Sequence, residues 1–257
     1  MSNDLLQFES RGPIAVVWLN RSHKRNALSD GLVLELRRAF ESMPGDVRAV
    51  VLAARGQHFS AGLDLGELTE RDPGQGLLHS RMWHQALDAI QYGRAPVIAA
   101  LHGAVVGGGL ELAAACHVRV ADDTTYYALP EGTRGIFVGG GGSVRIPKLI
   151  GTARMTDMML TGRVYDAEEG MRVGLSQYLV EDGQGMAKAL ALAEKVAANA
   201  PLSNFAVMHA LPRIAEMGQD EGLFTESLMA AVAQGDDAAK SRMRAFLDGK
   251  AGKVAKS

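Results

Sequence analysis

Short apolar runs alternate with a segment of helical periodicity in the first part of the chain. Residues 14–20 (IAVVWLN) and 48–54 (RAVVLAA) are short, apolar and rich in β-branched side chains, so each predicts a buried strand. Between them, residues 28–43 place apolar side chains at helical spacing, with Ser29 and Asp30 as candidate caps. This β-α-β order is typical of a largely parallel sheet, in which ligands are expected at the carboxyl ends of the strands.

The pattern continues on both sides of a glycine triplet, residues 107–109. Residues 96–101 and 117–121 predict two further strands, and a helix is expected to open at Glu111. The glycines either let the backbone approach a ligand or let a helix pack tightly on the sheet, and both explanations stay open. The triplet lacks the spacing of a dinucleotide-binding fingerprint, so a nucleotide fold is a poor match.

Helical patterns dominate after residue 149. They cover residues 153–160, 167–173, 185–200, 203–217 and 221–248. Because no long strand lies between them, the sequence predicts an α/β first part followed by a helical C-terminal subdomain.

Charge and cysteine content narrow the class of protein. The 257 residues carry a net charge of −2 with dispersed basic residues, which argues against a nucleic-acid partner. The single cysteine, Cys116, excludes an intramolecular disulfide and fits a reducing compartment. The acidic N-terminal residues do not resemble a signal peptide, and no apolar run reaches the ~18 residues of a membrane span. We therefore expect a cytoplasmic protein with no membrane partner.

Two glutamates are candidates for chemistry. Glu111 is the only charged side chain between His102 and His117, so it is expected to be buried. Burying an unpaired carboxylate costs several kcal/mol unless its pKa shifts or a partner binds it, which favours a functional role over a simple complement to the helix dipole. Glu131 precedes a glycine-rich loop, residues 139–142, that is expected to start a helix or turn; alone, such a glutamate is usually solvated.

A loop after the second predicted strand carries the motif HFSAGLDLGEL, which begins at His58. Asp64 followed by Glu67 resembles a capping box, so a helix is expected to begin just beyond Leu63. The amides near Leu63 would then lie at a positive helix end. The alternative is that Gly62 only lets the chain turn out of the strand.

Five segments, taken in their order and spacing, match one known pattern. They are KRNALS at Lys24, FSAGLDL at Phe59, PVIAALHGAVVGGGLELAAAC at Pro96, LPEGTRGIFVGGGG at Leu129 and LTGRVYDAEEGMRVGLSQYLV at Leu160. Together they resemble the crotonase superfamily, the enoyl-CoA hydratase/isomerase fold. The resemblance implies a spiral of ββα units over residues 1–195, and a helical subdomain over 196–257 that mediates homotrimers or homohexamers.

The resemblance also implies a reaction. The backbone amides of Leu63 and Gly108 would form an oxyanion hole for a CoA thioester carbonyl and stabilise an enolate. Glu111 would act as the base on a water molecule, and Glu131 would deliver a proton to the α-carbon of a trans-2-enoyl-CoA. This hydration implies a place in fatty acid β-oxidation. CoA is part of the acyl-CoA substrate, so neither a cofactor nor a metal is expected.

Substrate binding is expected at two loops, the C-terminal tail and an acyl pocket. The candidate CoA-binding residues are Lys24, Arg25, Ala27, Ala61, Leu63, Asp64, Leu65 and Lys250. Lys250 would act from a neighbouring subunit, or it is only a solvated lysine of the tail. Trp83 and Phe137 are candidates for the acyl pocket. Residues 77–90, with Met82 and Leu87, either line the acyl tail or belong to the core.

Two departures from the family pattern lie near the expected active region. Val138 replaces a common proline, and His117 replaces a common aspartate. The resemblance leaves a Δ3,Δ2-enoyl-CoA isomerase, a CoA-thioester hydrolase or a carbon–carbon lyase as alternatives, although simple isomerases commonly keep only the equivalent of Glu131. A binding protein without catalysis, for instance for RNA, is disfavoured by the acidic net charge and by both glutamates.

Overall fold

The computed structural model describes residues 5–67 and 70–249. It divides into two units, residues 1–197 and residues 198–257, where the sequence predicts a division after residue 195. Among the described helices, none is both long and apolar enough to span a lipid bilayer.

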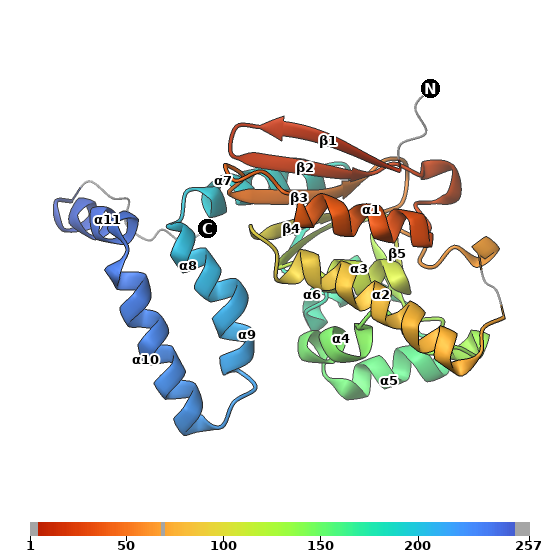
Figure 1. The fold of residues 1–257 in the computed structure, drawn as a ribbon. Coiled ribbons are helices and arrows are strands. Elements are labelled where there is room, and N and C mark those ends of the chain that lie inside the picture. The colour runs from red at the N-terminus through yellow and green to blue at the C-terminus, as the bar shows by residue number, and fades with distance from the viewer. Residues whose placement is uncertain (1–4, 68–69, 250–257) are drawn as a thin grey trace. The chain divides into compact units, whose positions relative to one another are not determined.

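Six strands form the main sheet of the first unit, in the order β1-β2-β3-β4-β6-β9. The first four of them are labelled in Figure 1. β1 pairs with β2 in antiparallel fashion, and the other neighbours are parallel, which confirms the largely parallel sheet. The strands are β1 (Leu6–Arg11), β2 (Ile14–Leu19), β3 (Ala49–Ala54), β4 (Val97–Leu101), β6 (Val118–Asp122) and β9 (Tyr178–Val180).

A second, smaller sheet consists of three short strands, β5 (Ala104–Val106), β7 (Tyr126–Ala128) and β8 (Tyr165–Asp166). β4 leads directly into β5, and β6 leads into β7, so the chain passes repeatedly from the main sheet to the second one. After β5 it enters helix α3 (Gly108–Ala115). This repeated path is the expected spiral of ββα units.

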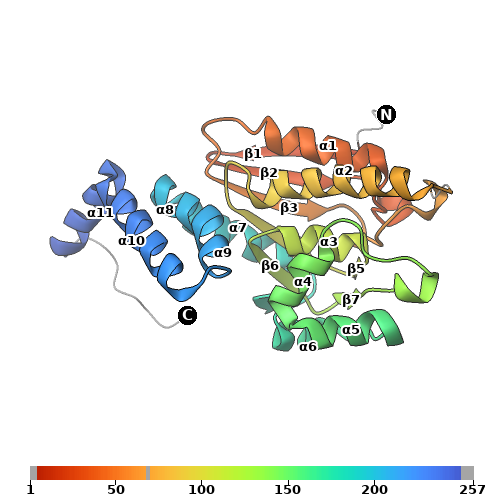
Figure 2. The same ribbon diagram turned by 60° about the horizontal axis from the view of Figure 1, so that its bottom comes forward.

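Helices cover both faces of the main sheet. α1 (Asp30–Glu41), α2 (Pro73–Gln91) and α3 lie side by side on one face (Figures 1 and 2). α7 (Gly185–Ala197) packs on the other face, where its Ala189 and Ala193 join Val51 in one apolar cluster. Leu52, the next residue of β3, joins the cluster under α1, α2 and α3. Because both faces are covered, β3 is an uninterrupted apolar run.

The chain enters helical turns after Ser29 and after Asp64, as the sequence predicts. Ser29 caps α1 by accepting from the amide of Leu32 at 3.2 Å. A short 3-10 turn, Leu65–Glu67, begins just beyond Leu63, and Oδ1 of Asp64 accepts from the amide of Gly66 at 3.0 Å at its start. The other carboxylate oxygen of Asp64, Oδ2, pairs with Arg21 at 2.5 Å. α2 begins later, at a capping box formed by Asp72 and Gln75.

Three shorter helices accompany the second sheet (Figure 2). They are α4 (Gly142–Ile150), α5 (Thr152–Thr161) and α6 (Ala167–Val173), and α6 contacts β7 and β8. α4 begins at the last glycine of the loop 139–142, as predicted. Two further 3-10 turns, Ser22–Lys24 and Gly132–Arg134, lie in loops.

The second unit is helical. It contains α8 (Pro201–Phe205), a π-helical turn (Ala206–Ala210), α9 (Leu211–Ile214), α10 (Gln219–Gly235) and α11 (Asp237–Leu247). The single helix predicted over residues 221–248 is wrong, since Asp236 has an extended backbone and separates α10 from α11. α10 exposes four large apolar side chains, those of Leu223, Phe224, Leu228 and Val232.

Candidate active site

One cavity of the first unit, about 390 Å³ in volume, brings both glutamates together. Six of its lining residues are site candidates from the sequence: Leu63, Trp83, Gly108, Glu111, Glu131 and Phe137. The sequence did not single out Arg71, Gly76 or Ile136 as site residues, whereas His79 and Ser80 belong to the segment 77–90 that was expected to line the acyl tail or the core, and Gly139 and Gly140 belong to the glycine-rich loop. Val138, the residue at the family's proline position, also lines the cavity and is almost fully buried.

Two backbone segments run alongside each other at the wall of this cavity. The amide of Ser60 donates to Ala104 at 2.9 Å, and the amide of Val106 donates to Ser60 at 3.1 Å. Gly62 has φ +90°, and a Cβ there would lie 2.7 Å from the carbonyl oxygen of Val106. Within residues 5–67 and 70–249, neither the amide of Leu63 nor that of Gly108 donates to another group. The structure therefore brings two unused backbone donors to one cavity wall.

The glycines at the start of α3 are required for different reasons. Gly107 has φ +54°, and a Cβ on it would lie 2.6 Å from Oε1 of Glu131. A Cβ on Gly109 would lie 2.6 Å from the carbonyl oxygen of Ser60. Close packing explains Gly109, whereas Gly107 makes room for a candidate catalytic carboxylate. Close packing, one of the two explanations from the sequence, therefore applies, and the approach of a ligand to this backbone stays a prediction.

Glu111 is buried as predicted, with 4% of its surface exposed. Its Oε1 accepts hydrogen bonds from the amides of Gly140 and Gly142, both at 2.8 Å. Burial raises the pKa of Glu111 above its ordinary value, and the bonds from Gly142 and Gly140 act in the opposite direction because they favour the ionised form. The carboxylate is thus held in one orientation by backbone donors from a distant loop.

The four-glycine loop explains this contact. A Cβ on Gly142 would lie 2.8 Å from Cγ of Glu111, so a larger residue would displace the carboxylate. Arg145 holds the loop from behind: its guanidinium donates to the carbonyl of Gly140 at 3.0 Å and to Asp88 at 2.6 Å. Arg145 was not predicted, because an arginine one turn into a helix carries no sequence signal for this role.

Glu131 lies opposite Gly107 with 7% of its surface exposed. Its Oε2 is buried, and no partner for it is found in the described part of the chain. Burial raises the pKa of Glu131 to about 7, and the nearby negative charge of Glu111 adds to this. The two carboxyl groups therefore differ in their partners: Glu111 accepts from two backbone amides, whereas Oε2 of Glu131 has no partner in the described residues and this group holds a proton near neutral pH.

The two loops proposed for CoA lie side by side. The amide of Ala61 donates to the carbonyl of Arg25 at 3.0 Å, and the amide of Leu28 donates to that of Gly62 at 2.7 Å. Lys24 and Arg25 are exposed next to the loop that supplies the Leu63 amide. Two exposed cationic residues thus lie next to the loop that contributes Leu63 to the cavity lining.

The other residues proposed for CoA differ in their surroundings. Leu65 is about half exposed and Ala27 is buried, whereas the carboxylate of Asp64 is occupied by Arg21 at Oδ2 and by the amide of Gly66 at Oδ1. Asp64 therefore fixes the loop rather than presenting a free carboxylate. Lys250 lies outside the described residues.

Three residues near the predicted site do not line the cavity. Leu87 belongs to the apolar core, and Met82 packs against that core. Of the two roles that the sequence left open for them, lining the acyl tail or forming the core, the structure favours the core. His117 is also away from the cavity, contrary to expectation. Its Nδ1 accepts from the amide of Val97 at 2.9 Å, and its Nε2 lies 3.0 Å from the carbonyl of Gln91. It joins the end of α2 to the start of β4.

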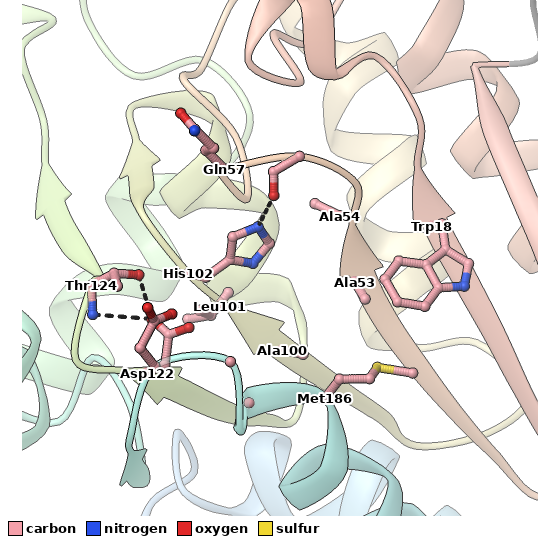
Figure 3. A pocket seen from close by; sticks show the side chains of 14 residues that line it. Trp18, Ala53, Ala54, Gln57, Ala100, Leu101, His102, Asp122, Thr124 and Met186 are labelled. Carbon is pink, nitrogen blue, oxygen red and sulfur yellow. Dashed lines mark hydrogen bonds between the residues drawn. The ribbon is translucent and has the colours of Figure 1, made fainter.

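A second cavity, about 470 Å³, lies at the carboxyl ends of β3, β4 and β6. Figure 3 shows His102, Asp122 and Thr124 on one side of it and Trp18 and Met186 on the other. Oδ1 of Asp122 is already occupied by the Thr124 hydroxyl at 2.5 Å. This cavity is larger, but neither Glu111 nor Glu131 lines it. No group of three or more metal-ligating side chains is found in the residues that the structure describes.

Comparison with known proteins gives a consistent result. The family model of enoyl-CoA hydratase/isomerase matches residues 9–253. The chain is 31% identical to the enoyl-CoA hydratase EchA19 of Mycobacterium tuberculosis, over 95% of this chain and 93% of that protein. It is 30% identical to the short-chain-enoyl-CoA hydratase of Clostridium acetobutylicum, over 93% of each.

Solved structures agree with this match. One from Rhodopseudomonas palustris has 61% sequence identity and a TM-score of 0.93, covering 96% of this chain and 95% of that one. An enoyl-CoA hydratase structure from Mycobacterium smegmatis has a TM-score of 0.91 at 27% identity, covering 98% of this chain and 99% of that one. The chain therefore belongs to the enoyl-CoA hydratase/isomerase family.

Proposed function

We propose that the protein is an enoyl-CoA hydratase that adds water across the trans-2 double bond of an enoyl-CoA thioester. The observation that supports this most is the meeting of Glu111 and Glu131 with the Leu63 and Gly108 amides in one cavity. A glutamate oriented by two backbone amides, Glu111, and a carboxyl group that keeps a proton near pH 7, Glu131, suit the base and acid that hydration requires.

The proposed reaction begins with the thioester carbonyl. Its oxygen accepts hydrogen bonds from the amides of Leu63 and Gly108, which stabilise the negative charge of the enolate; one donor of this kind is typically worth ~10²–10³ in rate. Glu111 removes a proton from a bound water as its oxygen adds to the β-carbon. Glu131 gives its proton to the α-carbon, so one water is added in total. Glu111 then returns a proton to Glu131, which restores the starting state.

The rest of the substrate would be held by the loops around the cavity. Lys24 and Arg25, which are exposed, would lie at the adenine end of CoA, and Trp83 and Phe137, which line the cavity, would contact the acyl chain. CoA enters as part of the substrate, so the proposed reaction uses no separate cofactor. We also propose a homotrimer or homohexamer built through the second unit, which the exposed apolar face of α10 supports; analytical ultracentrifugation tests this.

A panel of trans-2-enoyl-CoA substrates tests the proposed function. Crotonyl-CoA and longer or aryl enoyl-CoAs should lose the absorbance of the conjugated thioester when the enzyme is added. A folded protein that hydrates none of them would contradict the proposal. The same panel with 3-enoyl-CoAs would reveal an isomerase, the alternative that needs only Glu131.

A further inference from the structure

Helix α2 forms one wall of the active-site cavity and extends away from the end where Glu111 and Glu131 lie. The Trp83 ring lies against Gly108, 3.1 Å from the position of a Cβ there, and so marks the catalytic end. His79 and Gly76 face the same cavity at lower residue numbers. At 1.5 Å per residue, His79 lies about 6 Å and Gly76 about 10 Å further along the helix axis. Arg71 precedes the helix and also lines the cavity, and its guanidinium lies beside Asp30, which His79 and Trp83 contact as well.

Most polar side chains in this outer half already have a partner. His79 Nε2 lies 2.7 Å from Oδ1 of Asp30, and the Ser80 hydroxyl donates to the carbonyl of Gly139 at 2.6 Å. Trp83 Nε1 also donates to Oδ1 of Asp30, at 3.3 Å. These contacts fix the side chains on this face of α2 and leave few of their hydrogen-bonding groups available to a ligand.

Arg71 is different. In the described part of the chain its one ion pair is with Oδ2 of Asp30, at 3.6 Å, which is longer than a hydrogen bond. The Asp30 carboxylate also contacts His79 and Trp83, so it only partly neutralises the positive charge of the Arg71 guanidinium. A hydrocarbon chain laid against Arg71 would strip water from these donors and return no hydrogen bond. An anionic group would instead meet the planar fork that arginine offers to a carboxylate.

We propose that Arg71 binds an acidic group at the distal end of the acyl chain, so that the preferred substrates are enoyl-CoA thioesters of dicarboxylic acids. This inference rests on the proposed hydratase function. The reacting double bond lies between Glu111 and Glu131, the middle of the chain lies along Trp83, and the terminal carboxylate reaches Arg71.

Matched substrate pairs test the proposal. Straight-chain enoyl-CoAs of four to eight carbons are compared in pairs of equal length, one ending in a carboxylate and one in a methyl group. The wild type should favour the carboxylate member by roughly tenfold or more in kcat/KM at the best length. Arg71→Gln should remove that preference and change the methyl substrates by less than about threefold. Arg71→Lys should restore part of it, because lysine keeps the charge but not the fork.

Arg81→Gln is the control, since it removes one positive charge from an exposed position of α2 outside the cavity lining. It should leave the preference intact. Equal rates on both substrate types, or a loss in Arg71→Gln that is the same for both, would overturn the inference and leave the hydratase function standing.

A binding measurement separates the inference from the reaction. Calorimetric titration with saturated CoA thioesters needs no turnover. Tighter binding of the carboxylate thioester by the wild type than by Arg71→Gln supports the inference even if the protein hydrates nothing. Equal binding of the two proteins to both thioester types overturns it.

Discussion

Replacing Glu131 with glutamine should stabilise the protein at alkaline pH. The wild-type carboxyl group is buried, and burial raises its pKa from 4.5 to about 7. The folded protein therefore binds this proton more tightly than the unfolded chain does. The associated stability is fully present below about pH 4.5 and is lost as the pH rises through about 7. Glutamine has no proton to lose, so the variant escapes this loss.

The size of the effect follows from the pKa values. A tenfold change in proton affinity is about 1.4 kcal/mol, so a rise from 4.5 to about 7 corresponds to roughly 3 kcal/mol in total. Between pH 5 and pH 8.5 the wild type should lose about 2 kcal/mol or more in its free energy of unfolding relative to Glu131→Gln. Any pH-independent effect of the amide cancels in this difference.

Urea unfolding at one protein concentration, at pH 5 and pH 8.5, measures the difference. Glu41→Gln controls for the loss of one negative charge, because Glu41 lies on the surface of α1. The control should follow the wild type at both pH values. If Glu131→Gln also differs from the wild type by the same amount at pH 5 and pH 8.5, burial does not raise the pKa of Glu131, and its proposed role as the acid is refuted.

Three further predictions concern catalysis. The kcat/KM of hydration should fall as the pH rises above about 7, because Glu131 must carry a proton; a flat profile to pH 9 would contradict this. Arg145→Gln should lower kcat by roughly tenfold or more with a smaller change in KM, since Arg145 holds the loop that orients Glu111. An unchanged kcat would show that the loop keeps its conformation without Arg145. Gly142→Ala should lower hydration about 100-fold by displacing Glu111, while Gly235→Ala, where a Cβ meets nothing within 4 Å, should keep full activity; equal rates in both variants would exclude the steric explanation.

The strands of the main sheet could be predicted where their apolar runs were long. β3 is buried on both faces and therefore reads as an unbroken run. β1 could not be recognised, because LQFESR is mostly exposed and polar. β5 and β7 have three residues each, too few for any periodicity to appear, yet they form the second sheet that the spiral requires. The spiral therefore came from resemblance, whereas the parallel sheet and the helical C-terminal part came from the physical pattern.

The burial of Glu111 could be predicted because its neighbours carry no charge. Its partners could not, since Gly140 and Gly142 lie 29 and 31 positions later and meet it only through the packing of α4 on α3. Arg71 was missed for a similar reason: a single arginine in a polar loop forms no pattern until the fold brings it to the cavity. The sequence thus indicates that a single residue such as Glu111 is a candidate for a functional role, but it does not indicate which residues the fold places beside it.

The hydration of crotonyl-CoA by Glu111→Gln, compared with the wild type, tests the central claim most directly. Glutamine keeps the size of the side chain but cannot remove a proton from water, so the account predicts a fall in kcat of roughly 10²-fold or more, with unchanged circular dichroism. Isomerisation of a 3-enoyl-CoA, which depends on Glu131, could persist in the same variant. Hydration at the wild-type rate would contradict the proposed roles of the two glutamates.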